Sequence, residues 1–277
     1  MKSRNITIII VTYNSQDQIE SCLKSIDKQG IQADILIIDN CSTDETWQKL
    51  QTLKQPNITL IKNKTNNGFA KAVNQGIRYS NKNFKNNLFL LLNPDATLDK
   101  DCLKNITNTI ELNPRVGLCS PVIKNPLNRE VIFQKGQIDW LKMRTSHSAL
   151  PETSLDYLTG CCLLIKKAVT DKLEGFDERF FLYFEDADFS LRARREGFQI
   201  KTISNAICFH EESKSSDSAT KTYFLVKNGL IFFYKHFSLP IRFFYFWPIF
   251  TLRLLYHSLI SHKKPVIRGL KDFLSKR

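Results

Sequence analysis

The chain has 277 residues, of which 42% are hydrophobic, so it can bury a sizeable core and is not a disordered polypeptide. Its formal net charge of +13 predicts an acidic partner. Seven cysteines, an odd number without the spacing of a zinc site or a disulfide framework, favour a reducing cytoplasmic compartment. The short apolar run that ends at Val11 lacks a cleavage pattern for a signal peptide and is too short to span a bilayer.

Apolar strands and amphipathic helices alternate over the first ninety or so residues. The patterns Ser15-x-x-Gln18 and Ser42-x-x-Glu45 predict capping of the first two helices. Because each strand is continuously apolar, the pattern predicts a mostly parallel sheet that is covered by helices on both faces. The expected strands are residues 6–11, 33–38, 58–61 and 88–92, and a third helix is expected at 69–79.

Polar side chains follow these strands where each one ends. Ligands of parallel sheets bind at this edge, so it is the expected site. The turn after the first strand contains no glycine, and neither a dinucleotide-binding GxGxxG loop nor a P-loop is present. Most dehydrogenases and NTPases are therefore excluded. The residues at the edge are Thr12-Tyr13-Asn14, Asp39-Asn40, Asn63 and Asn93-Pro94-Asp95.

The middle of the chain predicts further strands that extend the sheet into a mixed one. The expected strands are 116–122, 131–133 and 157–165, with a polar loop at 134–155 between the last two. A helix is expected at 185–196 and a strand at 199–203.

Acidic residues follow apolar segments at four places in the chain. Asp39 and Asp95, expected at the ends of neighbouring parallel strands, favour a functional role. Asp177-Glu178 is better explained as a loop or helix cap. Glu185-Asp186-x-Asp188 opens a helix, where the helix dipole also favours carboxylates, and Arg192 is expected to pair with Asp188.

Seven ordered motifs between residues 6 and 215 give the chain a specific resemblance. It resembles family 2 glycosyltransferases of the GT-A fold, and in particular their rhamnosyltransferase-type members. The motifs are Ile10-Val11-Thr12-Tyr13-Asn14, Ile38-Asp39-Asn40-x-Ser42-x-Asp44, Asn67-Gly68-Phe69-Ala70-x-Ala72-x-Asn74-x-Gly76, Leu92-Asn93-Pro94-Asp95, Gly175-Phe176-Asp177-Glu178-x-Phe180-Phe181, Glu185-Asp186-x-Asp188 and His210-x-x-Ser213.

The resemblance implies a GT-A catalytic domain at 1–215, with a nucleotide-binding half at 1–98 and an acceptor and catalytic half at 99–215. It implies that a nucleotide-sugar donor is held by Thr12, Tyr13, Asn14, Asp39, Asn67, Gly68, Asn93 and Asp95. Gly68 suits a close approach of the backbone to the donor, and an ordinary turn before a helix explains it equally well.

The resemblance also assigns the metal and the catalytic base. Asn93-x-Asp95 occupies the place of the family's DXD motif, with Asn in the first position, and His210 matches a position that can complete the metal site. A core histidine at a strand end is the alternative for His210. The implied cofactor is Mg²⁺ or Mn²⁺, which takes oxygen ligands and substrate phosphates. By resemblance Asp186 is the base and transfer inverts the anomeric carbon, while Glu185 and Asp188 are reserve candidates.

The segment 216–277 is basic, aromatic and expected to be helical. Residues 191–277 carry 16 Lys and Arg against 5 Asp and Glu, interleaved with Phe, Tyr and Trp. This composition favours an anionic membrane surface over nucleic acid, and Pro240, Pro248, Arg242 and Arg253 argue against a transmembrane helix. A buried helical layer or a homodimer surface are the alternatives.

The predicted protein is a peripheral enzyme on the cytoplasmic face of the cell membrane. It is expected to transfer a sugar to a lipid-linked or polysaccharide acceptor in cell-envelope glycan synthesis, and the sugar expected is rhamnose from a dTDP donor. A sugar nucleotidyltransferase is the alternative within the fold, although the glycine-rich basic loop of that class is missing. A non-catalytic module that binds lipid or nucleic acid is the alternative of another class.

Overall fold

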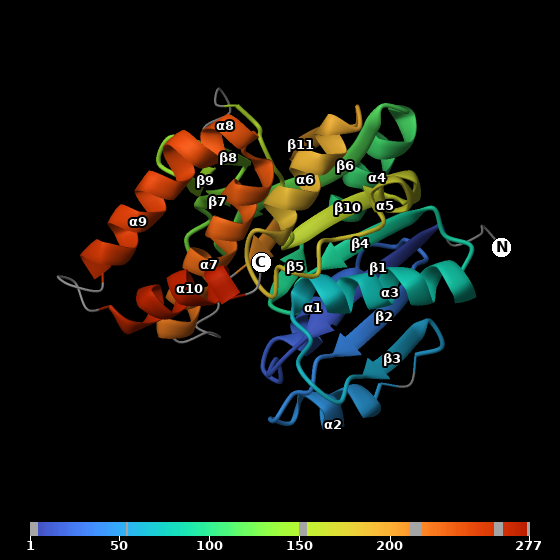
Figure 1. Cartoon of the computed structure of the whole chain (residues 1–277). Helices are drawn as coiled ribbons and strands as arrows, with labels where there is room; N and C mark the ends of the chain where they lie inside the picture. The colour runs from blue at the N-terminus through green and yellow to red at the C-terminus, as the bar shows by residue number, and fades with distance from the viewer. Residues whose placement is uncertain (1–4, 54, 150–153, 211–217, 258–262, 276–277) are drawn as a thin grey trace.

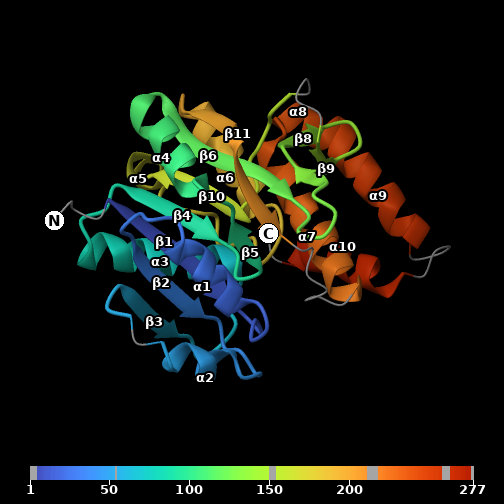
Figure 2. The same ribbon diagram turned by 180° about the vertical axis from the view of Figure 1, so that it is seen from behind.

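The computed structural model describes residues 5–53, 55–149, 154–210, 218–257 and 263–275. Its centre is a nine-stranded mixed sheet with the strand order β3-β2-β1-β4-β10-β6-β11-β5, and β7 pairs with β6 outside this path. Figure 1 shows helices on both faces of the sheet and a group of C-terminal helices, drawn in orange and red, at one side. Figure 2 shows the same arrangement from behind.

The first half of the sheet is parallel, as the sequence predicts. In register, Thr12 lies opposite Asp39 and Ile9 lies opposite Leu91, so the strands end at a common edge. The strands are β1 (Ile6–Thr12), β2 (Asp34–Asp39), β3 (Ile58–Lys62) and β4 (Leu88–Leu92), and the helices between them are α1 (Ile19–Asp27), α2 (Thr46–Gln51) and α3 (Phe69–Asn83).

The second half of the sheet contains strands of both directions. Strand β10 is antiparallel to β4 and β6, and β11 is parallel to β6 but antiparallel to β5. Because β4 and β6 are both antiparallel to β10, β6 and its parallel neighbour β11 run in the direction of the first strands, and β11 ends at the edge where those strands end. The elements are β5 (Ala96–Leu98), α4 (Cys102–Leu112), β6 (Val116–Lys124), β7 (Val131–Phe133), β10 (Cys162–Lys166), α5 (Lys167–Leu173), α6 (Glu185–Arg195) and β11 (Gln199–His210).

Two hydrophobic layers hold the helices on the sheet. On one face, Ile8 and Ile10 pack with residues of α1 and α4. On the other face, Ile9 and Leu91 pack with residues of α3, α5 and α6. Alternate residues of one strand thus serve opposite layers, which explains why strands covered on both faces are continuously apolar.

Three local predictions are wrong. The expected loop at 134–155 contains a hairpin of β8 (Lys135–Asp139) and β9 (Arg144–Ser148), in a short sheet of its own. The expected strand at 157–165 is regular only from Cys162, because Tyr157 bridges to Gly136 of the hairpin. Neither Ser15 nor Ser42 is the N-cap residue of a helix, because α1 and α2 begin later, after Gln18 and Glu45, and these two residues make no side-chain cap bond.

The C-terminal helices share the hydrophobic core with the sheet. Phe232, Phe233 and Phe246 are fully buried in the same cluster as Ile8 and Phe184. Among the described helices, none is both long enough and apolar enough to cross a bilayer. The elements are α7 (Ser218–His236), α8 (Leu239–Ile241), the π-helical turn η1 (Arg242–Phe246), α9 (Trp247–Tyr256) and α10 (Lys264–Ser275).

Candidate active site

The carboxylate of Asp39 lies fully buried at the end of β2. Thr12 and Ser42 donate hydroxyl hydrogen bonds to its Oδ1 atom at 3.1 and 2.5 Å, and the Ser42 amide donates to Oδ2 at 3.1 Å. Ser42 therefore orients Asp39 instead of capping α2. Three donors fix the carboxylate in one orientation, and Oδ2, which accepts one hydrogen bond, keeps a lone pair for a further donor.

Tyr13 and Asn14 lie in the loop that leaves the same edge. The Asn14 amide donates to Ser42 Oγ at 2.9 Å, and its side-chain oxygen accepts from the Thr43 amide at 2.8 Å. These bonds join the loops that follow β1 and β2. The Tyr13 side chain is 46% exposed, so its ring can contact a ligand above the edge.

Asn40 organises the loop that contains Asn67 and Gly68. Its side chain donates to Asn66 Oδ1 at 2.9 Å and to the Gly68 carbonyl at 3.2 Å, and it accepts from the Asn67 amide at 3.2 Å. Asn40 was noted at the strand end but was not among the predicted site residues. Its position directly after Asp39, at the same strand end, was the feature of the sequence that could have identified it as a site residue.

Gly68 is required by packing within the protein. Its φ is +79°, and a Cβ atom there would lie 2.6 Å from the carbonyl oxygen of Phe181. The next amide, that of Phe69, donates to the same carbonyl at 2.8 Å. The glycine thus joins the loop at 66–68 to the loop before α6, so its presence does not depend on a bound donor.

Asp95 and His210 meet although 115 positions separate them, because β11 returns antiparallel to β5. His210 pairs in register with Ala96, and its Nε2 atom lies 3.1 Å from Asp95 Oδ1. That oxygen is buried and has no hydrogen-bond partner among the described residues. The sequence placed Asp39 and Asp95 on neighbouring strands, which is wrong, since β1 lies between β2 and β4. Ser213, which ends the His210 motif, lies outside the described residues.

The pair of Asp95 and His210 fits a divalent cation that completes its shell with substrate oxygens. A buried carboxylate oxygen without a partner is the kind of atom that an ion satisfies. Within the described ranges, no group of three or more His, Cys, Asp or Glu side chains could hold a metal, so the residues described here supply only a partial shell.

The thiols behind this pair do not behave as ligands. The hydrogen bond with Cys208, followed by burial, raises the pKa of Cys161, and burial raises the pKa of Cys22. Both groups are therefore neutral thiols when no metal is bound. A hard divalent cation prefers the oxygen and nitrogen atoms of Asp95 and His210 to thiol sulfur.

Glu185 and Asp186 open α6 and occupy different environments. Burial raises the pKa of Asp186, although its carboxylate accepts backbone hydrogen bonds from Gly160 at 3.0 Å and Ala187 at 2.7 Å. Burial and the neighbouring Asp186 raise the pKa of Glu185 well above its ordinary value, and its Oε2 atom has no partner among the described residues. Burial and the neighbouring carboxyl group thus favour the protonated form of Glu185, and the half-buried Asp186 is the carboxylate placed to accept a proton.

Asp188 is engaged on both oxygens and has a structural role. Its Oδ2 atom bonds Arg192 at 2.8 Å, which confirms the expected pairing, and its Oδ1 atom lies 2.6 Å from Lys235 and 2.8 Å from His236. Burial opposes its charged form, but His236, Arg192 and Lys235 outweigh it and lower the pKa of Asp188. Asp188 is thus not available as a base.

Asp177 and Glu178 lie in a loop, as the simpler interpretation predicts. Asp177 pairs with Arg179 at 2.6 Å and with Lys235 at 2.7 Å. Glu178 accepts from Asn74 at 3.1 Å. Both acids hold the loop before α6 in place.

A two-residue segment joins the expected metal motif to the expected base. The Gly160 amide donates to Asp186 Oδ2 at 3.0 Å, and the next carbonyl, that of Cys161, accepts from the Asn93 amide at 2.9 Å. The predicted site residues from the two halves of the chain therefore converge on one edge of the sheet. Asp39 and Thr12 form one end of this edge, and Asp186 forms the other.

A family model described as Glycosyl transferase family 2 matches residues 7–174, which is more than half of the chain. The chain belongs to glycosyl transferase family 2. The expected GT-A fold and the expected class of enzyme, a glycosyltransferase, are therefore confirmed.

Individual relatives agree with the family. The chain is 30% identical to the low-salt glycan biosynthesis hexosyltransferase Agl10 of Haloferax volcanii over 207 residues. The matched region is 71% of this chain and 64% of the relative. It is 24% identical to the N-acetylglucosaminyl-diphospho-decaprenol L-rhamnosyltransferase of Mycobacterium tuberculosis, over 76% of this chain and 77% of the relative. The fold matches a Pyrobaculum calidifontis mannosyltransferase, solved with GDP-Man and Mn²⁺, with a TM-score of 0.64, 17% identity and coverage of 100% and 89%.

The contacts of His236 predict that acid destabilises the protein. Arg195 donates to Nδ1 at 2.7 Å, so Nε2 carries the proton that faces Asp188, and the imidazole is neutral. Burial lowers the pKa of His236 below its ordinary value. As the pH falls below about 6.5, His236 therefore binds a proton in the unfolded chain but not in the folded chain. The free energy of unfolding then decreases by up to about 1.4 kcal/mol per pH unit.

Urea unfolding at pH 7.5 and 5.5 measures this effect. His236→Gln retains a donor and an acceptor but does not titrate, so it should lose less stability on acidification than the wild type. Lys235→Met removes another partner of Asp188 without adding a titrating group in this range, and should lower stability similarly at both pH values. Equal pH dependence of wild type and His236→Gln would contradict the assignment.

Proposed function

We propose that the protein is an inverting glycosyltransferase that moves a sugar from a nucleotide-sugar donor to a hydroxyl group of a glycan or lipid-linked acceptor. The observation that carries this proposal is the link from Asn93 through Cys161 and Gly160 to Asp186. It holds the donor-phosphate motif and a carboxylate of raised pKa at one edge, as a direct displacement requires.

The donor occupies the edge formed by the first four strands. Asp39 receives an N–H of the base, Tyr13 and Asn14 lie at the mouth, and the loop with Asn67 and Gly68 follows the ribose. Asp95 and His210 would hold the divalent cation, which when bound would stabilise the negative charge of the departing diphosphate. Support for such a cation comes from the buried Asp95 oxygen, which accepts no hydrogen bond from the described residues, and from the Mn²⁺ of the mannosyltransferase complex.

Asp186 acts on the acceptor. It takes the proton of the attacking hydroxyl as the new bond forms at the anomeric carbon and the bond to the diphosphate breaks. Its two backbone donors fix the carboxylate, so little reorientation is needed in the transition state. Protonated Glu185 adds no second charge beside the base.

The sugar proposed is rhamnose from dTDP-rhamnose, and the acceptor a lipid-linked intermediate of cell-envelope glycan synthesis. The names of the Mycobacterium tuberculosis rhamnosyltransferase and of an O-antigen chain rhamnosyltransferase of Salmonella typhimurium support this choice. The name of the Haloferax volcanii hexosyltransferase supports glycan synthesis more generally.

Removal of the metal-facing carboxylate should abolish metal-dependent donor binding. Asp95→Ala leaves His210 and the neutral Asn93, which cannot balance the charge of a cation with a diphosphate. Thermal stabilisation by dTDP, UDP and GDP, each with and without Mn²⁺, measures the effect, because a ligand of the folded state raises its stability. Lys100→Ala, an exposed position after β5, is the control. Unchanged metal-dependent stabilisation of Asp95→Ala would refute the role of this residue.

Replacement of the base should separate binding from transfer. Asp186→Asn preserves shape but accepts no proton, so donor affinity should persist while turnover falls by about 10²–10⁴-fold. Single-turnover transfer to the acceptor and nucleotide binding are measured on the same preparation. Asp186→Asn turnover near that of the wild type would move the base elsewhere.

We also propose that the protein lies on an anionic membrane surface through α8, η1 and α9. Apolar side chains project from this segment, including Phe243 at 69% and Phe244 at 77% exposure. With the basic residues of the same region they form the mixture typical of interfacial helices, in which rings enter the headgroup boundary and cations meet lipid phosphates.

Vesicle co-sedimentation tests this surface. Full-length protein should bind vesicles with 30% or so anionic lipid, more weakly at high salt, because the charge contribution is screened and the apolar contribution is not. Phe243→Ser with Phe244→Ser should weaken binding by about tenfold or more. The matched control is Leu112→Ser with Leu127→Ser, which alters leucines that are 79% and 82% exposed elsewhere. If the two double variants lose vesicle binding to the same extent, Phe243 and Phe244 do not form a membrane-binding surface.

A further inference from the structure

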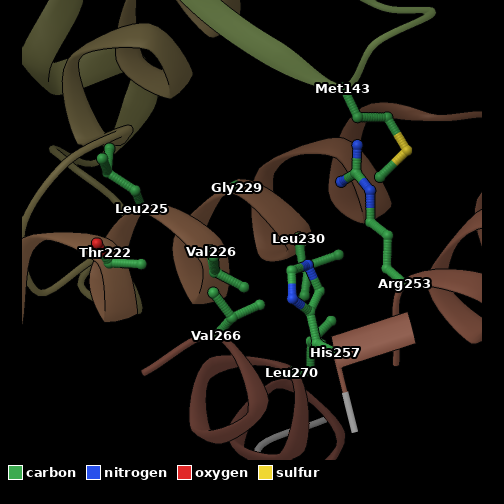
Figure 3. A pocket seen from close by; sticks show the side chains of 10 residues that line it. All are labelled: Met143, Thr222, Leu225, Val226, Gly229, Leu230, Arg253, His257, Val266 and Leu270. Atoms are coloured by element: carbon green, nitrogen blue, oxygen red, sulfur yellow. The ribbon is translucent and has the colours of Figure 1, made fainter. Parts of the chain in front are cut away.

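A cavity of about 370 Å³ lies between α7, α9, α10 and the turn of the β8–β9 hairpin. Figure 3 shows that its walls are mainly apolar side chains, among them Met143, Leu230, Val266 and Leu270. The volume falls at the lower end of the range of small-molecule sites, roughly 300–1,000 Å³. The cavity is separate from the edge that carries Asp39 and Asp95.

Two basic side chains line the otherwise apolar cavity. The Arg253 guanidinium donates one hydrogen bond, to the Lys142 carbonyl at 3.1 Å, and no carboxylate of the described residues pairs with it. The Nδ1 atom of His257 is buried without a partner in the described part of the chain. In Figure 3 the Arg253 guanidinium extends toward Met143, and the His257 ring lies beside Leu230 and Leu270. Counting the described residues alone, the cavity therefore offers donors without partners and positive charge without a facing carboxylate, beside hydrocarbon.

Burial and mutual repulsion oppose the charged forms of these two basic groups. Burial lowers the pKa of both Arg253 and His257, and the positive charges of Lys263 and Arg253 lower that of His257 further. A bound anion would relieve this repulsion and supply acceptors for the free donors. A neutral hydrocarbon alone would leave both groups unsatisfied.

The inner wall of the cavity touches the catalytic helix. Gly229 of α7 lines the cavity, and a Cβ atom placed on it would lie 3.2 Å from the ring of Phe184. Phe184 directly precedes Glu185 and Asp186 at the start of α6. A ligand in the cavity therefore lies next to the turn that carries the base.

The outer side of the cavity adjoins exposed apolar surface. Leu225 lines the cavity and is itself 39% exposed. On α9, Leu252, Leu255 and Tyr256 are exposed beside Arg253 in the sequence. The cavity lining and the helix beside it thus both carry exposed apolar side chains that a hydrocarbon chain can contact.

We propose that the cavity binds the phosphate-bearing end of the lipid that carries the acceptor, with the phosphate on Arg253 and His257 and the first part of the hydrocarbon chain between α7 and α10. This inference rests on the proposed function, because it names the class of acceptor as a lipid phosphate. The guanidinium supplies paired donors that match phosphate oxygens, and the apolar walls exclude water from them.

Isothermal titration of full-length protein with farnesyl phosphate, farnesol and inorganic phosphate, each below its aggregation concentration, tests the proposal directly. Farnesyl phosphate contains both the chain and the phosphate and should bind at least about tenfold more tightly than either part alone. Equal affinity for farnesol and farnesyl phosphate would overturn the role of the two basic residues. Absence of farnesyl phosphate binding would overturn the site.

Variants separate the cavity from general positive charge. Arg253→Gln and His257→Gln should each weaken farnesyl phosphate binding, Arg253→Gln by about tenfold, which is the loss expected for one charge-assisted hydrogen bond. Lys264→Gln makes the same change of charge at an exposed position of α10 and should leave affinity unchanged. Circular dichroism and melting temperature establish that each variant is folded. Equal losses for Lys264→Gln and Arg253→Gln would contradict specific binding.

Two further measurements separate the competing outcomes. Dihexanoyl phosphatidic acid carries the same phosphate group on a glycerolipid of the bulk-membrane type. If it binds as tightly as farnesyl phosphate and loses the same affinity in Arg253→Gln, the cavity is a site for membrane headgroups, and the acceptor assignment is overturned. Nucleotide-dependent stabilisation is measured in parallel. Farnesyl phosphate binding without any nucleotide binding would refute the proposed transferase function, whereas nucleotide binding without farnesyl phosphate binding would refute only the cavity.

Discussion

The buried carboxylate of Asp188 is the point at which the catalytic helix and the C-terminal helices are joined. A charge taken fully out of water costs several kcal/mol unless partners replace its hydration. Arg192 supplies one partner from α6 itself, while Lys235 and His236 come from the end of α7. The sheet domain therefore cannot satisfy this charge without the C-terminal segment. The position of the turn with Glu185 and Asp186 depends on the same contacts.

The carboxylates near the start of α6 differ in pKa because their partners differ. Glu185 is buried and Asp186 is half-buried, neither has a cation at hydrogen-bonding distance among the described residues, and burial raises the pKa of both. Asp188, two positions later, is held by Arg192, Lys235 and His236, and its pKa is lowered. One helical turn thus contains groups suited to proton transfer and a group suited to packing. Such separation of neighbouring carboxyl groups is a recurrent feature of acid–base sites.

Main-chain contacts, rather than side-chain pairs, unite the two halves of the site. Strand β10 runs antiparallel beside β4, so the residues before Cys162 lie next to the residues after Leu92. Gly160 and Cys161 consequently reach Asp186 and Asn93 together. Because peptide groups of a sheet edge move little, the distance between the metal-facing motif and the base is set by the fold.

The sequence by itself determined the alternation of strands and helices, the edge at which they end and the residues Thr12, Asp39 and Asp95 at that edge. These features follow from local periodicity and from the period of apolar residues along each strand. The pairing of Arg192 with Asp188 was predictable for the same reason, since the two residues are one helical turn apart. The hairpin at 135–148 was missed, because its partly exposed strands lack the continuous apolar pattern of the central sheet.

Tertiary structure alone decided which distant groups became neighbours. His210 reaches Asp95 only because β11 is antiparallel to β5, and Ser42 turns to Asp39 because the loops after β1 and β2 pack together. Lys235 and His236 are distant from Asp188 in sequence, and Arg253 and His257 enclose a cavity only when α9 and α10 fold onto α7. These contacts join residues that lie tens of positions apart and meet only when the chain folds back on itself. The local sequence pattern indicates only which face of its own helix or strand a side chain occupies.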